Sequence, residues 1–251
     1  MFPTEFEIID ISQPVNSRTA CFPGDVPFSK SLTVSYKESR LINLTCITLS
    51  PHVGTHAESS SHIQGDIEET DTNIGAAPLA PYVGRAIVLD FSPMKNGAVT
   101  AQMIKERLRA MSDAVGTVSA AGTLGEVGTV SAAGSAGTPG ANGPELPPRV
   151  LLKTQRSINY ESWAGDYPYI GIDAADYLHS QGVQLVGIDT PSVDQVSAKE
   201  LNTHHVLNNH GMFWLENLDL TTAQPGYYLL VAAPLRFTEV EASPVRALLL
   251  K

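Results

Sequence analysis

Short apolar runs that alternate with helix-like stretches are the feature that most constrains the fold of this chain. The runs are rich in β-branched residues, which is typical of strands. Their alternation with helices predicts an α/β or mixed domain. The predicted strands are 8–11, 42–49, 85–91, 149–153, 184–188 and 227–232, and the predicted helices are 100–111, 174–181 and 198–209.

The last predicted helix has the clearest boundaries. Ser197 and Glu200 match a capping box, in which each side chain accepts a hydrogen bond from the backbone of the other residue. Gly211 follows the final turn, at a place where glycine commonly ends a helix. We therefore expect a helix from about residue 198 to residue 209.

Residues 112–148 differ in composition from the rest of the chain. Gly, Ala, Ser and Thr dominate, and the octet VGTVSAAG starts at Val115 and again at Val127. A segment of this kind cannot bury a core, which predicts a flexible surface insertion between a helix ending near Met111 and a strand starting near Arg149. We expect residues 1–251 to form a single domain with this insertion, to which the sequence assigns no role.

Composition excludes several classes of protein. The 251 residues carry 26 acidic and 16 basic side chains, without the Lys/Arg cluster that nucleic-acid binders need. The sequence shows neither a signal-peptide pattern nor an apolar segment long enough to cross a bilayer. Cys21 and Cys46 are the only cysteines and do not make a disulfide framework. We therefore expect a soluble cytoplasmic protein with neither nucleic acid nor membrane as a partner.

Three histidines and a carboxylate lie within eleven positions. His52 and His56 have the spacing of a helical metal motif, but the surrounding Pro, Gly and β-branched residues disfavour a helix. In an extended chain, residues of one parity share a face, so His52, His56, Glu58 and His62 would project together. Gly54 would leave space for a cation between the first two imidazoles.

The donor atoms of this cluster favour a catalytic metal. Imidazole nitrogen and carboxylate oxygen, without a cysteine, suit zinc, manganese or iron better than a structural thiolate-bound zinc. A histidine-rich loop with ordinary hydrogen-bonding roles is the alternative.

The C-terminal half adds a second group of candidates. Glu216 lies in an apolar segment, where burying a carboxylate is costly without a cation or donor partner. A solvent-facing Glu on an edge strand is an equal alternative. Periodicity does not decide whether His204 or His205 faces inward, and His179 and His210, near helix ends, are expected on the surface.

Several separated motifs resemble one known family. Residues 52–62 match the pattern HxGTHxDxxxH, with Glu58 where Asp is usual. The run GIDTPSVD at 187–194, the distal blocks THH and LENL and the ending ASPVRA follow in the same order. On these motifs the chain resembles the cyclase-like metal-dependent hydrolases and, within them, the bacterial kynurenine formamidases (arylformamidases). The likeness spans nearly the whole chain except the insertion.

This resemblance implies a fold and a site. The fold would be a compact cyclase-like swivelling β/β/α domain of α/β class, with a mixed sheet or barrel-like core. His62 would act as acid/base catalyst, and Phe22, in a segment similar to WPGD, would contact substrate. The site would hold two Zn²⁺ ions per subunit, with Mn²⁺ as an alternative. The implied metal ligands are His52, His56, Glu58, His204 and Glu216.

The resemblance also implies a reaction. N-formyl-L-kynurenine would be hydrolysed to L-kynurenine and formate in tryptophan degradation, by a homodimer or higher homo-oligomer. Hydrolysis of a cyclic amide such as isatin is the nearest alternative, and a catalytically inactive metal-binding homologue or an interaction protein built around the insertion are others.

Glu58 in place of Asp adds one methylene, enough to move a ligand oxygen by roughly an ångström. Ser60, where many relatives have proline, makes the loop less rigid.

Overall fold

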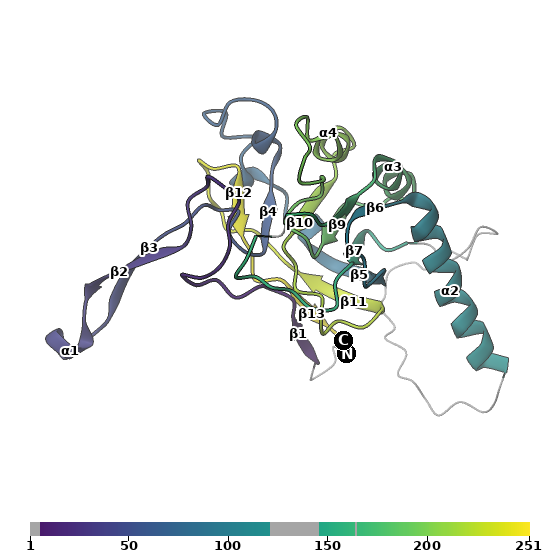
Figure 1. Cartoon of the computed structure of the whole chain (residues 1–251), viewed down its shortest axis with the longest axis horizontal. Helices are drawn as coiled ribbons and strands as arrows, with labels where there is room; N and C mark the ends of the chain where they lie inside the picture. Colours follow the sequence, from purple (N-terminus) through teal and green to yellow (C-terminus); the bar gives the residue numbers. More distant parts are fainter. Residues whose placement is uncertain (1–5, 121–145, 164) are drawn as a thin grey trace.

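A curved mixed sheet forms the centre of the molecule (Figure 1). The computed structural model describes residues 6–120, 146–163 and 165–251. In sheet order the strands are β1 (Ile8–Asp10), β13 (Leu248–Leu250), β11 (Gly226–Val231), β5 (Val83–Asp90), β7 (Arg149–Lys153), β9 (Leu185–Ile188), β10 (Phe213–Glu216), β4 (His56–Glu58) and β12 (Ala242–Pro244).

The middle of this sheet is parallel and its two sides are antiparallel. Strands β5, β7, β9 and β10 pair in parallel, whereas the outer pairs, including β10 with β4, are antiparallel. The parallel strands are nearly continuous apolar runs because both of their faces are buried. The predicted mixed α/β architecture is therefore confirmed.

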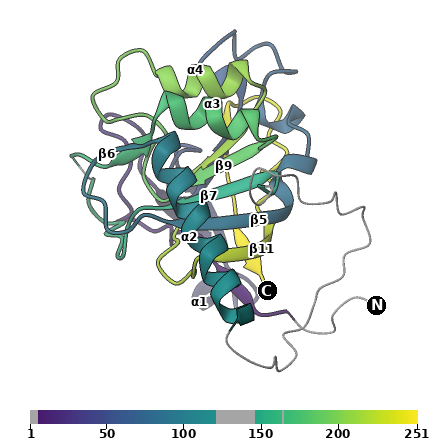
Figure 2. The same cartoon turned by 90° about the vertical axis from the view of Figure 1, so that its right-hand side faces the viewer.

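Helices cover one face of the parallel strands (Figure 2). Val150 and Leu152 of β7 belong to the core under these helices, whereas Leu151 belongs to a second core on the opposite face. This alternation along one strand is the period of two expected of a sheet buried on both sides. The helices are α2 (Ala101–Ala120), α3 (Ile172–Ser180) and α4 (Asn202–Asn209).

Smaller elements surround the sheet. Strands β2 (Ser29–Val34) and β3 (Leu44–Thr48), with helix α1 (Tyr36–Ser39) at their tip, form an arm that extends away from the body (Figure 1). A separate parallel pair consists of β6 (Gly97–Val99) and β8 (Pro168–Ile170). The described residues also form the 3-10 helices η1 (Ser60–His62), η2 (Ile74–Ala76) and η3 (Ala80–Tyr82).

All six predicted strands occur, with ends shifted by two residues or fewer, but two helix boundaries were wrong. Helix α2 continues to Ala120, so residues 112–120 belong to a helix rather than to the insertion. This stretch contains no proline, and its alanines favour a helix. The rest of the predicted insertion, 121–145, lies outside the described residues, and the single-domain organisation stays a prediction.

The predicted capping box of the last helix was also wrong. Helix α4 begins at Asn202, beyond both Ser197 and Glu200. The Asp194 carboxylate accepts hydrogen bonds from the backbone N–H groups of Thr203 and His204 instead, at 2.9 and 3.1 Å. A carboxylate eight residues before the helix outcompetes the local motif because the loop brings it to the helix N-terminus. The predicted end of the helix, followed by Gly211, is confirmed.

Candidate active site

The candidate ligands lie where β4 pairs with β10. Glu216 of β10 is directly opposite His56 of β4 in this antiparallel register, and β4 also carries Glu58. Helix α4 adds His204, which is buried, whereas His205 is exposed. Glu216 is only 2 % exposed on an interior strand, which excludes the solvent-facing alternative.

The expected extended run from His52 to His62 was wrong. Only His56–Glu58 is a strand; a turn precedes it and η1 follows it. Gly54 has a φ of +75°, and a Cβ there would lie 2.7 Å from Val15. Gly54 therefore permits a tight turn, rather than leaving space for a cation, and this turn returns the His52 ring to Glu58.

Glu58 lies at the centre of the cluster. Its Oε1 atom is 2.8 Å from His52 Nδ1, 3.2 Å from His56 Nε2 and 3.8 Å from His62 Nε2. Its Oε2 atom is 3.2 Å from His204 Nε2. The structure thus gathers side chains that the sequence could place only in two separate segments.

Glu216 joins the two sides of the same cluster. Its Oε2 atom is 3.3 Å from His56 Nε2, and its Oε1 atom is 3.4 Å from His204 Nε2. Oε1 also accepts a hydrogen bond from the backbone N–H of Val193 at 2.7 Å. This bond fixes the orientation of the Glu216 carboxylate.

The charges in the cluster depend on one another. Burial disfavours the charged form of Glu58, but the neighbouring imidazoles of His204, His52 and His56 outweigh it and hold the pKa of the carboxyl well below its usual value. Burial likewise opposes charge on the histidines, yet the carboxylates raise the pKa of His52 to about 9 and that of His56 to about 10. In the metal-free protein, protons therefore compensate the two carboxylates.

The histidine environments fit a divalent cation. Each of the three candidate ligand rings has one nitrogen held by an outer oxygen: Gly54 O for His56, Asp194 for His204 and Glu241 for His52. This is the usual arrangement around metal-binding imidazoles, because the outer acceptor fixes the ring and its tautomer. The inner nitrogen, His204 Nε2, is buried and makes no hydrogen bond of acceptable geometry within the described residues.

Two sets of ligand atoms share Glu58. One contains His52, His56 and Glu58, and the other contains Glu58, His62 and His204; within each set all ligand atoms lie within 4.8 Å of one another. With nitrogen and oxygen donors alone, these residues could hold zinc or another divalent transition metal.

His62 is the most exposed histidine of the cluster, and His52 follows with a side chain that is 19 % exposed. The His62 side chain is 27 % exposed and lines the cavity, and its ring makes no hydrogen bond within the described part of the chain. Burial and the nearby His52 and His204 rings lower its pKa, whereas hydrogen bonds to carboxylates outweigh burial and raise the pKa of His52 and His56. A neutral, accessible imidazole can accept a proton from water, as a general base must.

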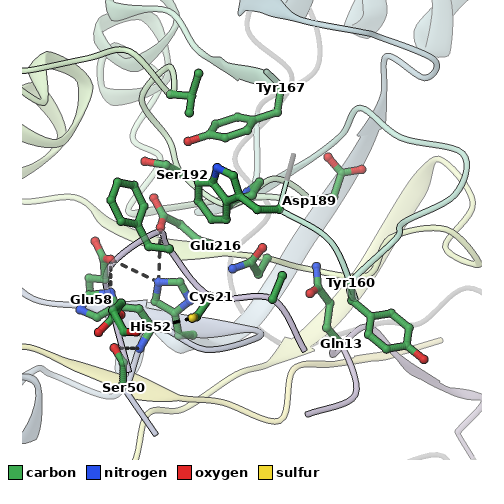
Figure 3. Close-up of a pocket in the computed structure, with 18 of the residues that line it drawn as sticks. Gln13, Cys21, Ser50, His52, Glu58, Tyr160, Tyr167, Asp189, Ser192 and Glu216 are labelled. Atoms are coloured by element: carbon green, nitrogen blue, oxygen red, sulfur yellow. Dashed lines mark hydrogen bonds and ion pairs between the residues drawn. The ribbon is translucent and has the colours of Figure 1, made fainter. Parts of the chain in front are cut away.

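The cluster lies in a cavity of about 940 Å³ with aromatic walls. Figure 3 shows His52, Glu58 and Glu216 grouped at one end, with Tyr160 and Tyr167 farther along. Phe22 lines this cavity, and its ring meets that of Trp163 edge to face at 5.1 Å.

Four residues of the site were not identified as functional candidates from the sequence. Asp194 stands in the GIDTPSVD run, but only the structure shows that it holds His204 Nδ1 at 2.6 Å. Glu241 is distant in sequence from His52, and no local pattern marks Glu241, Trp163 or Trp214 as part of the site. The predicted surface position of His179 is confirmed, and its ring stacks on the half-buried ring of His210 at 4.0 Å.

Replacing Asp194 with alanine should weaken the binding of a divalent cation, with zinc as the probe, by about 10- to 100-fold, because His204 loses the partner that orients its ring. Removing the N-terminal cap of α4 should also lower the free energy of unfolding by about 1 kcal/mol. Competition with a chromophoric chelator and thermal unfolding measure the two effects. Asp194→Asn, which retains one capping oxygen, should recover stability more than affinity; unchanged affinity in both variants would contradict the orienting role.

Comparison with known proteins places these features in one family. The family model described as "Putative cyclase" matches residues 9–195. The chain belongs to the cyclase family. The kynurenine formamidase of Bordetella pertussis is 34 % identical over 240 residues, covering 96 % of both chains, and that of Bacillus cytotoxicus is 33 % identical over 244 residues, covering 97 % of both. These full-length relatives confirm the resemblance and the assignment of this cyclase-family chain as a hydrolase of the arylformamidase type.

Solved structures show the same fold. A predicted metal-dependent hydrolase from Bacillus stearothermophilus has a TM-score of 0.68 at 21 % identity and covers 98 % of this chain and 99 % of its own. An isatin hydrolase bound to the product analogue thioisatinate has a TM-score of 0.72 at 19 % identity, with coverages of 98 % and 93 %. The implied cyclase-like fold is therefore confirmed.

Proposed function

We propose that this protein hydrolyses N-formyl-L-kynurenine to L-kynurenine and formate in tryptophan degradation. The observation that supports this most is the buried His/Glu cluster at one end of an aromatic-walled cavity, in a chain with full-length kynurenine formamidase relatives. The formyl group would lie at the cluster and the aryl ring between aromatic walls, including Phe22 and Trp163.

The proposed cofactor is Zn²⁺, two ions per subunit, with Mn²⁺ as the alternative. The ligands would be His52, His56, Glu58, His204 and Glu216, and Glu58 would be shared between the two ions. A divalent cation held there would polarise the formyl carbonyl and activate water.

His62 is the proposed proton carrier of the reaction. As water adds to the formyl carbon, the His62 imidazole accepts a proton from it. When the C–N bond breaks, the same ring returns this proton to the departing aniline nitrogen, so that the amine leaves neutral. Its accessible position beside Glu58 supports this role.

Hydrolysis of a cyclic amide such as isatin is the second candidate, which the structural similarity to isatin hydrolase favours. Turnover of both substrates should be followed by absorbance, before and after chelation and after adding back zinc or manganese. We expect kynurenine to form only with metal present. Bound metal with isatin turnover alone would favour the second candidate, and a protein that binds no metal would overturn both.

Assembly into a homodimer or higher homo-oligomer is also proposed. The arm formed by β2, α1 and β3 exposes several large apolar side chains, and a two-stranded hairpin is only marginally stable alone. Light scattering should give at least twice the single-chain mass of 26.8 kDa, and a monomer would contradict this. The exposed residues include Leu32, Tyr36, Leu41, Ile42, Leu44 and Ile47.

Among the described residues, no helix combines the length and apolar character needed to cross a bilayer. The cytoplasmic location stays a prediction from the sequence.

A further inference from the structure

Trp214 contacts the cluster but belongs to none of its ligand sets. Its indole N–H donates a hydrogen bond to Glu58 Oε2 at 2.7 Å, and its ring meets that of His204 edge to face at 5.4 Å. Trp214 is only 2 % exposed. This contact is therefore a buried, charge-assisted hydrogen bond made by a side chain that can only donate.

The sheet register explains the contact. Leu215 pairs with Ala57 and Glu216 with His56, so Trp214 and Glu58 stand at the next pair of positions along β10 and β4. Side chains opposite each other on one face of an antiparallel pair are close enough to bond. Trp214 and Glu216 share this face because their positions differ by two.

Glu58 has more freedom than the aspartate that is usual in the family pattern. Its longer side chain has one more rotatable bond, so its two oxygens could take several orientations among the surrounding histidines. The indole N–H removes this freedom by holding Oε2. Oε1 then faces His52 Nδ1 and His56 Nε2, at 2.8 and 3.2 Å.

We propose that Trp214 is a positioning residue for the metal site, whose N–H fixes Glu58 Oε2 and thereby directs Oε1 towards His52 and His56. The proposal rests on the proposed metal-binding role of Glu58. It makes Trp214 and Glu58 a matched pair: an aspartate at position 58, one methylene shorter, would withdraw its oxygens from the indole by roughly an ångström and lose the bond.

The first test is the zinc affinity of Trp214→Phe, measured in the full-length protein by competition with a chromophoric chelator. We expect affinity to fall by about tenfold or more, as is typical when the outer partner of a ligand is removed. Tyr82→Phe is the matched control. Tyr82 is a buried aromatic residue near β10 whose hydroxyl has no hydrogen-bond partner in the described structure. The zinc affinity of Tyr82→Phe should therefore stay within about twofold of that of the wild-type protein.

A double-mutant cycle separates the hydrogen bond from the packing of the ring. In Glu58→Asp protein, adding Trp214→Phe should change zinc affinity by less than about twofold, because the bond is already absent. An equal loss in both backgrounds, or full affinity in the single variant Trp214→Phe, would overturn the proposal.

A third variant guards against misfolding of Trp214→Phe. Incorporating benzothienylalanine at position 214 replaces the N–H with sulfur and keeps the shape of the ring, so zinc affinity should fall as in Trp214→Phe while the metal-free protein still unfolds in one cooperative thermal transition. Full affinity in this variant would contradict the proposal. Because zinc affinity is the readout, wild-type protein that binds zinc without hydrolysing N-formylkynurenine would overturn the proposed function alone, and wild-type protein that binds no zinc would overturn both.

Discussion

Replacing His62 with alanine is expected to lower kcat for N-formylkynurenine by about two to four orders of magnitude, the usual contribution of a positioned acid/base group. Bound metal should remain, because His52, His56, Glu58 and Glu216 are unchanged. The effect follows from the position of His62, exposed to the cavity and with a pKa that burial lowers. Steady-state kinetics and metal quantification by mass spectrometry on the same samples check both parts.

The matched control for this prediction is His205→Ala. His205 is exposed on α4, beside the buried His204, so its loss should change neither kcat nor metal content. If His62→Ala lost metal in parallel with activity, the prediction that His62 acts only as an acid/base group would be wrong. Such a loss would make His62 a ligand, as in the set that it forms with Glu58 and His204.

The strands were predictable because their signal is local. Strand β7 was predicted with both ends correct, since the apolar run VLL is bounded by Arg149 and Lys153 and two prolines precede it. Strands β4 and β12 are among those that were not predicted. They are three residues long, and they exist through pairing with each other and with β10 rather than through their own sequence.

The site was predictable only in part, because its geometry depends on long-range pairing. Periodicity could not choose between His204 and His205; the loop that brings Asp194 to the start of α4 decides in favour of His204. The apolar segment around Glu216 and the family pattern supplied the distal candidates, whereas Glu241 lies 189 residues from the His52 ring that it holds. No local sequence signal reports a contact of that kind.

Replacing Glu216 with glutamine should weaken zinc binding by at least about a hundredfold, since removing one partner of a buried charged pair typically costs about 3–5 kcal/mol. Glu216 Oε1 is held by the Val193 N–H and both of its oxygens face imidazoles. An amide has a single acceptor oxygen, so it cannot satisfy Val193, His56 and His204 together. Metal quantification after dialysis against buffered zinc measures the loss.

Glu200→Gln is the control for this substitution, because Glu200 is exposed and its loss should leave zinc content unchanged. The number of zinc ions that stay bound to Glu216→Gln then shows which of the two proposed ions Glu216 helps to bind. Glu216 approaches His56 from one oxygen and His204 from the other, so a site that holds two ions through both oxygens should lose both in Glu216→Gln. One retained ion would assign Glu216 to a single ion, and full retention would show that its carboxylate only orients the histidines.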